Sequence, residues 1–497
     1  MADRFVNSIL RPAGARAVWL LVMPLLLAAS PQLSAQGAKA VDPGVRGDKI
    51  DAGAPLPGLS AGQSATFAAG MATFIAARSI GGNLPMQPQE GLGPRYNSNS
   101  CGSCHSQPAI GGTSPSASHF PKIGSNPQVA VASLSGATNR VPYFIQADGP
   151  VREARFRHVV RNGSVTNAPD GGVHDLFTVS GRSDATNQPG TAGTPQTCTL
   201  AQPDFEHARI TNNISFRIPT PVFGAGLIEA ISDRTILDNL AADAGAKRAF
   251  GISGRPNRNG NDGTITKFGW KAQNATLLMF AGEAYNVEMG VTNELFSVER
   301  ASPGETLPPT CIFNQTPEDS SHLDFNPAKP SGDATSPYSD VQLFTAFMAM
   351  LAPPTASTSS PGGGPSIQRG ETLFRGTLGC ALCHTPTLTA SVSPFINQGS
   401  GQAAAVNLFS DLLVHSMGER LADGVTQGLA GPSEFRTAPL WGLGQRVFFL
   451  HDGRTTDLVH VIRSHAGEES EARISAEQYF ALSEPDKQHV LNFLRSL

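Results

Sequence analysis

The sequence predicts a mainly α-helical fold with two related domains, long loops and a few short β-strands in the region between the domain centres. Hydrophobic residues make up 40% of the 497-residue chain and charged residues 15%, a composition typical of globular proteins. Its 52 glycines and 38 prolines together make up about 18% of the chain, against a usual ~12% in globular proteins. This excess indicates many loops. One five-residue pattern, C-x-x-C-H, occurs twice and predicts the two domains.

The first 40 residues have the pattern of an export signal. Three arginines precede an apolar run at residues 17–29, and small residues follow it. The run is shorter than the roughly 20 residues that span a bilayer as a helix. We therefore expect residues 1–40 to be a signal peptide, with a transmembrane anchor as the alternative. The mature protein is then periplasmic, without stable membrane insertion, and its net charge of −4 gives no indication of nucleic acid binding.

Four of the six cysteines lie in the two C-x-x-C-H patterns. The residues concerned are Cys101, Cys104, His105, Cys380, Cys383 and His384. This spacing is the attachment signature of c-type haem, in which two thiols bond to the macrocycle and the adjacent histidine binds the iron. A redox dithiol does not explain two copies, and a zinc site does not need a histidine after each pair. We therefore predict two covalently bound haem c groups, with His105 and His384 as iron ligands.

The two patterns divide the rest of the chain. We expect residues 41–354 to form an N-terminal haem domain with a long insertion, and residues 367–497 to form a C-terminal cytochrome c-like haem domain. Residues 355–366 are rich in Ser, Gly and Pro and are interpreted as the linker. Alternating runs at 174–182 and 214–219 predict short strands between the two haem patterns.

Helical periodicity predicts the main helices. They are expected at 62–79, 234–250, 274–285 and 336–354, with a short helix from 367 towards the second haem pattern. Residues 254–263 are rich in turn residues instead. Their Asn and Asp oxygens make this loop a candidate calcium site, with a bare loop as the favoured alternative.

Cys198 and Cys311 remain outside the haem patterns. An oxidising compartment favours a disulfide between them. Two buried free thiols are the alternative, since the sequence does not show whether these residues meet.

The C-terminal segment contains a candidate sixth ligand for the iron bound by His384. A helix is expected to start near Thr456, with a threonine cap and Asp457 in its first turn. Its apolar positions fall on the same face as His465. His460 falls off that face and is expected in solvent. We predict His465 as the ligand. The competing candidates are Met417, His415 and His451. Of these, His451 is expected to contact a haem propionate or to orient a neighbour.

The first iron has several candidate distal groups. Three histidines, none in a distinctive pattern, are candidates: His119, His158 and His174. Glu288 is another, because peroxide cleavage needs a group that takes a proton from one oxygen and delivers it to the other. A carboxyl group does this when a nearly dry pocket adjusts its pKa. An ordinary surface acid is the alternative interpretation of Glu288.

Several motifs occur in an order that resembles a known family. They are "YNSNSCGSCHSQPAIGG", "GPVREARFRH", "FRIPTPVFGAGLIEAI", "FGWKAQ" and "FRTAPLWGLGQRVFFLHDGR". Together they resemble the bacterial dihaem c-type oxidoreductase family, whose members are described as peroxidase-like or thiol-oxidoreductase-like. The resemblance covers roughly residues 75–497. The chain is also distantly similar to the bacterial dihaem cytochrome c peroxidases and to the enzymes that mature a tryptophylquinone cofactor.

The resemblance implies roles for individual residues. In those relatives the N-terminal haem is the reaction site and the C-terminal haem relays electrons, which implies a reactive haem on His105 and a relay on His384. The segment "NVEMG" resembles the one that bears a distal catalytic glutamate and implies that role for Glu288. The segment "KFGWKAQ" resembles the one with a tryptophan between the haems, which implies Trp270, with Phe268 as the alternative.

His465 falls where these relatives place the distal ligand of the relay haem. The chain also departs from them: its inter-haem stretch is longer, and no clear distal histidine follows the first pattern at a matching position, unless it is His119. A permanently open first haem is expected instead. We expect a periplasmic, peroxidase-like oxidoreductase that uses a small redox donor protein and an oxidant such as peroxide. The alternatives are a non-enzymatic dihaem electron carrier and a dioxygenase similar to the dihaem rubber oxygenases.

Overall fold

The computed structural model of the protein describes residues 38–47, 52–115, 125–161, 163–186, 188–189, 195–322, 337–393 and 403–497. Its contacts group residues 40–497 into one compact unit. Most of the expected signal peptide lies outside the described residues, so it stays a prediction. None of the helices within these ranges combines the length and the apolarity that crossing a bilayer requires.

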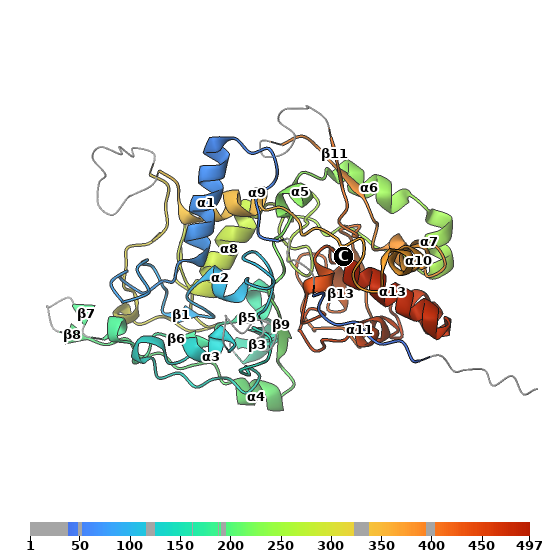
Figure 1. The fold of residues 1–497 in the computed structure, drawn as a ribbon. Coiled ribbons are helices and arrows are strands. Elements are labelled where there is room, and N and C mark those ends of the chain that lie inside the picture. The colour runs from blue at the N-terminus through green and yellow to red at the C-terminus, as the bar shows by residue number, and fades with distance from the viewer. Residues whose placement is uncertain are drawn as a thin grey trace, which may run out of the picture. The chain divides into compact units, whose positions relative to one another are not determined.

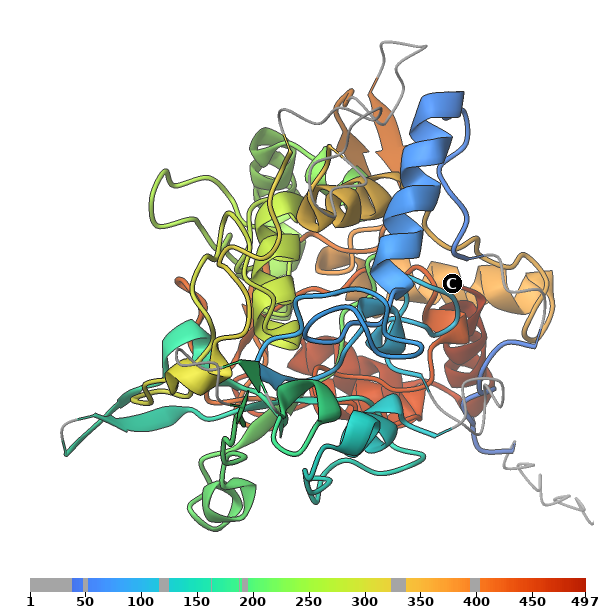
Figure 2. The same cartoon turned by 90° about the vertical axis from the view of Figure 1, so that its left-hand side faces the viewer.

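Helices form the frame of the fold. The described ranges contain thirteen α-helices: α1 (Ala61–Ile75), α2 (Cys101–Cys104), α3 (Pro127–Val131), α4 (Phe205–Ile210), α5 (Ala225–Glu229), α6 (Asp233–Ala241), α7 (Ala244–Phe250), α8 (Leu277–Met289), α9 (Asp340–Met350), α10 (Gly364–Arg375), α11 (Leu458–His465), α12 (Arg473–Ala481) and α13 (Glu484–Ser496). In Figure 1, α9 packs against both α1 and α8, and α10 packs against α13. Figure 2 shows α1, the long blue helix, from a second direction.

Local sequence explains where several helices begin and end. Ser60 and Ser339 are the N-caps of α1 and α9, and each forms a capping box with a glutamine three residues later. The expected single helix at 234–250 is instead two helices, α6 and α7, because the chain turns at Asp243, where φ is 53°. α8 continues to Met289, beyond its predicted end, before a glycine C-cap stops it. This extension matters because it carries Glu288.

The strands are short. The described residues contain β1 (Arg95–Tyr96), β2 (Glu153–Arg155), β3 (His158–Arg161), β4 (Ser164–Asn167), β5 (Val173–His174), β6 (Phe177–Thr178), β7 (Gln188–Pro189), β8 (Pro195–Gln196), β9 (Ser215–Arg217), β10 (Leu388–Ala390), β11 (Ala404–Val406), β12 (Val414–Ser416) and β13 (Glu434–Arg436). One sheet has three strands, in the order β5-β2-β9, and the others have two. The fold is therefore mixed rather than mainly α. The alternating runs at 174–182 and 214–219 do contain strands, namely β6 and β9, whereas most of the other strands are too short to show an alternating pattern.

Two main clusters of buried apolar side chains support the fold. The larger cluster surrounds α1, α8 and α9, and the smaller one surrounds α10 and α13. In the larger, the rings of Phe74 and Phe347 lie 5.0 Å apart; in the smaller, those of Phe374 and Phe493 lie 5.3 Å apart. α10 begins at Gly364, inside the expected linker. The expected domain boundaries themselves stay predictions.

A disulfide joins Cys198 and Cys311, which are both buried. The alternative of two free thiols is therefore wrong. The four cysteines of the two C-x-x-C-H patterns are free.

Candidate functional site

The first C-x-x-C-H pattern forms α2 and the residue that follows it. Ser100 is the N-cap of α2 and accepts a hydrogen bond from the backbone N–H of Ser103. This cap fixes the single helical turn that carries Cys101 and Cys104, and His105 follows as the C-cap. Both thiols and the imidazole line one cavity of about 160 Å³, which we call the N-terminal cavity.

The tautomer and the neutral charge of the His105 imidazole are those that iron ligation requires. Its Nδ1 atom lies 3.0 Å from the carbonyl oxygen of Gly112. Because a carbonyl oxygen only accepts, Nδ1 carries the proton and Nε2 keeps its lone pair for a metal. Burial lowers the pKa of His105, so the ring is neutral at pH 7. The ring of Phe74 packs edge-on against it at 5.9 Å.

Glu288 lies at the C-terminal end of α8 and lines the same cavity. Its Oε2 atom accepts a hydrogen bond from Nδ2 of Asn97 at 2.8 Å, and its backbone carbonyl accepts one from the Asn97 N–H, also at 2.8 Å. Burial and the neighbouring Glu153 carboxylate raise the pKa of Glu288 to about 8. Glu288 is therefore a protonated acid at neutral pH, not an ordinary surface carboxylate.

The described lining of the N-terminal cavity contains no second histidine. His158 is exposed on β3. His174 is buried against the ring of Phe156, with 3.8 Å between ring centroids, and does not line the cavity. His119 lies outside the described residues, so its role as a distal group stays a prediction.

The second C-x-x-C-H pattern lines a larger cavity of about 230 Å³, which we call the C-terminal cavity. Cys380 begins a 3-10 turn after α10, and Cys383 and His384 follow that turn. His465, the last residue of α11, lines the same cavity. Residues from two distant segments therefore meet around one space.

Backbone carbonyls orient both imidazoles of the C-terminal cavity. Nδ1 of His384 lies 3.1 Å from the carbonyl oxygen of Phe409, and Nδ1 of His465 lies 2.8 Å from that of Val461. Each ring therefore protonates at Nδ1 and keeps the Nε2 lone pair. Burial lowers the pKa of His384 to about 4 and also lowers that of His465. Two neutral imidazoles are thus available to one metal ion.

The start of α11 is anchored by acidic residues. Asp457 is its N-cap, one residue later than the cap expected at Thr456. Asp42 accepts a hydrogen bond from the following backbone N–H at 2.7 Å and forms an ion pair with Arg495 of α13. Negative charge at a helix N-terminus is favourable. These contacts fix the helix that carries His465 at its other end.

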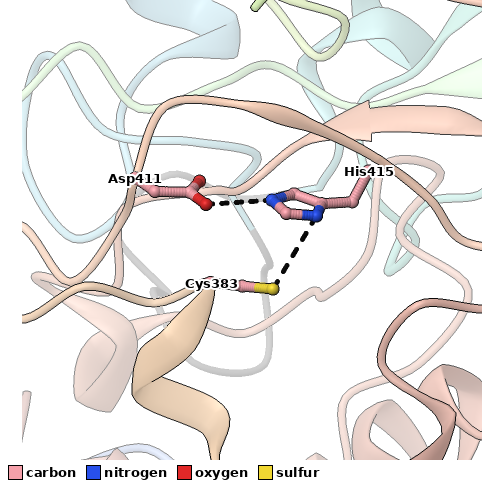
Figure 3. A group of neighbouring side chains, drawn as sticks. All are labelled: Cys383, Asp411 and His415. Carbon is pink, nitrogen blue, oxygen red and sulfur yellow. Dashed lines mark hydrogen bonds and ion pairs between the residues drawn. The ribbon is translucent and has the colours of Figure 1, made fainter. Parts of the chain in front are cut away.

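The rival ligand His415 is engaged elsewhere. Its Nε2 lies 2.9 Å from Asp411, and its Nδ1 lies 3.8 Å from Sγ of Cys383 (Figure 3). Nδ1 also lies 2.8 Å from Glu471. Burial opposes protonation of His415, but Asp411 raises its pKa well above the ordinary value. Although the donor atoms of Cys383, Asp411 and His415 are close enough to hold a metal ion, an imidazolium has no lone pair to offer. Met417 lines the C-terminal cavity.

Trp270 lines both cavities. Its Nε1–H donates a hydrogen bond to the carbonyl oxygen of Ile218 at 2.9 Å. Its ring meets His451, another residue of the C-terminal cavity, edge-on at 6.4 Å. Phe268, the alternative, stacks on Phe280 and belongs to the described lining of neither cavity.

Comparison with known proteins identifies the family. The family model described as "Di-haem oxidoreductase, putative peroxidase" matches residues 165–497. The chain belongs to this family. No curated protein matches the chain. Among solved structures it is similar to a chain of Kuenenia stuttgartiensis hydrazine synthase pressurised with 20 bar xenon, with 15% identity, a TM-score of 0.23, and coverage of 38% of this chain and 59% of that chain. That likeness is too weak to carry an argument.

Membership in the di-haem oxidoreductase family indicates haem cofactors, and the cavities fit them. Each cavity has two free thiols and a histidine with an available Nε2. The C-terminal cavity also holds buried Arg446, whose Nε and Nη2 atoms have no hydrogen-bond partner among the described residues. Burial lowers the pKa of Arg446 to about 10, which leaves it charged at pH 7. An unpaired buried cation suits a haem propionate.

The sequence did not reveal three residues of this oxidoreductase's sites. Glu153 and Asn97 contact Glu288, and Arg446 lies over the ring of Trp270 at 5.8 Å. Glu153 and Asn97 lie in segments quoted for the family resemblance, but their spacing gives no sign that they meet α8. Only long-range packing brings them together.

Two side-chain oxygen atoms of the candidate calcium loop accept hydrogen bonds from backbone N–H groups. Oδ1 of Asn257 accepts a hydrogen bond from the Leu429 N–H at 2.8 Å, and Oδ1 of Asp262 accepts one from the Thr264 N–H at 3.0 Å. Calcium binding there stays a prediction.

Proposed function

We propose that this chain is a periplasmic c-type oxidoreductase that reduces peroxide at a haem on His105 and relays electrons through a haem on His384. The difference between the two cavities carries the proposal. The C-terminal cavity offers two imidazoles, from His384 and His465, whereas the described lining of the N-terminal cavity offers His105 and the acid Glu288. Two protein ligands close an iron to substrates, and one leaves a position open.

The compartment and the partner follow from chemistry. An export pattern at the N-terminus and a buried disulfide between Cys198 and Cys311 both suit an oxidising compartment such as the periplasm. Reduction of one hydrogen peroxide molecule to two waters needs two protons and two electrons. We propose that the electrons come one at a time from a small redox donor protein.

Haem bound in these cavities would supply an iron that binds peroxide at the N-terminal site and a one-electron carrier at the C-terminal site. Glu288, protonated at neutral pH, donates its proton to the peroxide oxygen that leaves as water. The resulting carboxylate then takes up a proton from solvent and delivers it to the second oxygen, which leaves as water once it has received the two electrons. Trp270 lines both cavities, so its indole lies on the route between the two sites.

Electron paramagnetic resonance of the ferric protein tests the asymmetry, with one high-spin and one low-spin haem expected. In stopped-flow mixing with hydrogen peroxide, Glu288→Gln should slow the reaction by about 10²- to 10⁴-fold, the usual range for general acid–base catalysis. Glu299→Gln is the matched control, because burial and Glu318 also raise its pKa to about 8 but it lines neither cavity.

Other outcomes would reject the proposal. Two low-spin haems that bind neither cyanide nor carbon monoxide would indicate a non-enzymatic electron carrier. Oxidation of an apolar substrate by dioxygen, without added reductant or peroxide, would indicate a dioxygenase. An unchanged rate in Glu288→Gln would remove Glu288 from the mechanism.

The number and linkage of the haems have a separate test. The pyridine haemochrome assay on denatured protein should report two thioether-linked haems per chain. Replacing both cysteines of one pattern with alanine, either Cys101 and Cys104 or Cys380 and Cys383, should leave one. Haem that extracts into acid acetone would contradict covalent attachment.

A further inference from the structure

A second carboxyl group, that of Glu153, lines the N-terminal cavity beside Glu288. Glu153 is the first residue of β2 and pairs in register with Arg217 of β9. The side chains of Glu153 and Glu288 both line this cavity, and Glu153 acts on Glu288 through its charge and as a side-chain hydrogen-bond partner. Behind the pair, Nε of Arg155 donates to Oε1 of Glu153 at 2.6 Å, and Nδ2 of Asn97 donates to Oε2 of Glu288 at 2.8 Å.

Two carboxyl groups in contact favour a state with one shared proton. Two adjacent carboxylates repel each other, so one of them holds a proton, which then forms the hydrogen bond between them. The cation of Arg155 stabilises a negative charge on Glu153, whereas the amide of Asn97 gives Glu288 no compensating charge. The proton therefore resides on Glu288 and the negative charge on Glu153.

The other groups around Glu288 do not change this assignment. The remaining charged or titratable groups of the cavity lining are Arg152, Arg217, Glu283, Tyr285, His105, Cys101 and Cys104. Arg155 lowers the pKa of Glu288, but its effect is smaller than that of Glu153, which raises this pKa. The pKa of Tyr285 lies well above its ordinary value, and His105 is neutral. Both thiols become uncharged thioethers once haem is attached.

We propose that Glu153 and Glu288 act as a carboxyl pair that shares one proton, in which Glu288 transfers this proton to peroxide and Glu153 helps to restore it. This inference rests on the proposed function. When the O–O bond breaks, the proton of Glu288 goes to the oxygen that leaves as the first water. The pair is then doubly ionised, and the repulsion between its charges drives uptake of the next proton from solvent. The other oxygen leaves as the second water after it has received two electrons and this next proton, carried by Glu288. The two electrons come from the redox donor protein, so the pair is not consumed.

Glu153 acts through Glu288 and is a positioning residue rather than a catalytic one. Its removal should therefore change the protonation of Glu288 in addition to the rate. Loss of the Glu153 charge removes a repulsion that disfavours ionised Glu288, so the pKa of Glu288 should fall. A purely structural role for Glu153 predicts no such change.

Infrared titration of the ferric holoprotein, in the absence of peroxide, measures this protonation directly. The parent should show a protonated-carboxyl band that disappears in Glu288→Gln. In Glu153→Gln the midpoint of this band should move to lower pH by about 1 to 3 units, the effect of one neighbouring charge. Glu153→Asp keeps the charge and should restore the parent midpoint. An unchanged midpoint in Glu153→Gln would overturn the proposal.

The pH profile of the peroxide reaction gives a second readout. The rate in the parent should fall as pH rises through the ionisation of Glu288, and in Glu153→Gln this fall should begin at lower pH. Glu299→Gln should lose its own infrared band and keep the parent profile. A parent-like profile in Glu153→Gln would contradict the role of Glu153 in proton transfer.

The failures of this inference and of the proposed function are distinguishable. If the infrared midpoint moves as expected but peroxide does not react, the carboxyl pair exists and the peroxidase function is wrong. If peroxide reacts and Glu288→Gln is slow while Glu153→Gln matches the parent in both readouts, the function holds and the carboxyl pair is wrong.

Discussion

His384 and His465 line one cavity and present the same tautomer, because each Nδ1 atom lies within 3.1 Å of a backbone carbonyl oxygen. Phe409 supplies one of these oxygens and Val461 the other. The second carbonyl belongs to the preceding turn of α11, so the orientation of His465 is built into its own helix. The Nε2 atoms of two residues that lie far apart in the sequence are therefore both available to one metal ion.

The first prediction concerns the ligand His465. His465→Ala should convert the low-spin signal of the C-terminal haem into a high-spin signal in electron paramagnetic resonance, because one imidazole is lost. His460→Ala is the matched control, since His460 is exposed on the same helix. If the low-spin signal survives in His465→Ala, Met417 becomes the leading ligand, because it lines the same cavity.

The second prediction concerns Trp270. Trp270→Phe keeps an aromatic ring but removes the indole and its hydrogen bond to Ile218. Electrons given to the C-terminal haem should reach the N-terminal haem more slowly, as measured by stopped-flow reduction with a donor protein. Trp441→Phe serves as the control, because Trp441 lines neither of the two large cavities. Equal transfer rates in parent and Trp270→Phe would place the electron route elsewhere.

The third prediction concerns the buried charge cluster around Asp423. Its carboxylate pairs with Arg217 at 2.5 Å and Lys271 at 3.2 Å, and the side chains are at most 2% exposed. Asp423→Asn leaves two buried cations without their anion and should lower the free energy of unfolding by about 3–5 kcal/mol, the range for breaking a buried ion pair. Guanidinium denaturation measures this, and Asp238→Asn on the exposed face of α6 should have no measurable effect.

The same cluster makes stability depend on pH. Burial opposes ionisation of Asp423, but Arg217 and Lys271 outweigh it and lower its pKa from 3.8 to about 2. A lowered acid pKa contributes stability that is complete above the unfolded value and is lost as pH falls through the folded one. We therefore expect the parent to lose stability between about pH 4 and pH 2 more steeply than Asp423→Asn. Burial also lowers the pKa of Lys271 to about 8, so the ion pair is intact at neutral pH.

The fourth prediction concerns the disulfide. Cys198 and Cys311 are separated by 113 residues, so their bond restricts a long loop of the unfolded chain. The free energy of unfolding of the double variant Cys198→Ser and Cys311→Ser should be about 2–5 kcal/mol lower than that of the parent. A reducing agent should destabilise the parent and leave the double variant unchanged, and identical unfolding curves with and without reductant in the parent would show that the bond is absent.

Features that depend on local spacing were accessible from the sequence. Haem attachment requires two thiols and a histidine within five residues, so both C-x-x-C-H patterns can be recognised in the sequence before the fold is known. Helical periodicity likewise placed His465 on the apolar face of the helix that became α11, although its cap is Asp457 rather than Thr456. The turn at Asp243 and the extension of α8 to Met289 were missed, because helix boundaries respond to packing as well as to propensity.

Features that depend on long-range packing were not accessible. Glu288 is an unremarkable acid in the sequence, and its raised pKa arises because the chain buries it beside Glu153 and against Asn97. Trp270 could be distinguished from Phe268 only once the lining of both cavities was known. The sequence thus predicts where haem attaches, since the two thiols and the histidine of each pattern are near neighbours along the chain. Folding selected the residues that line the two cavities, since burial and electrostatic contact join segments that lie far apart along the chain.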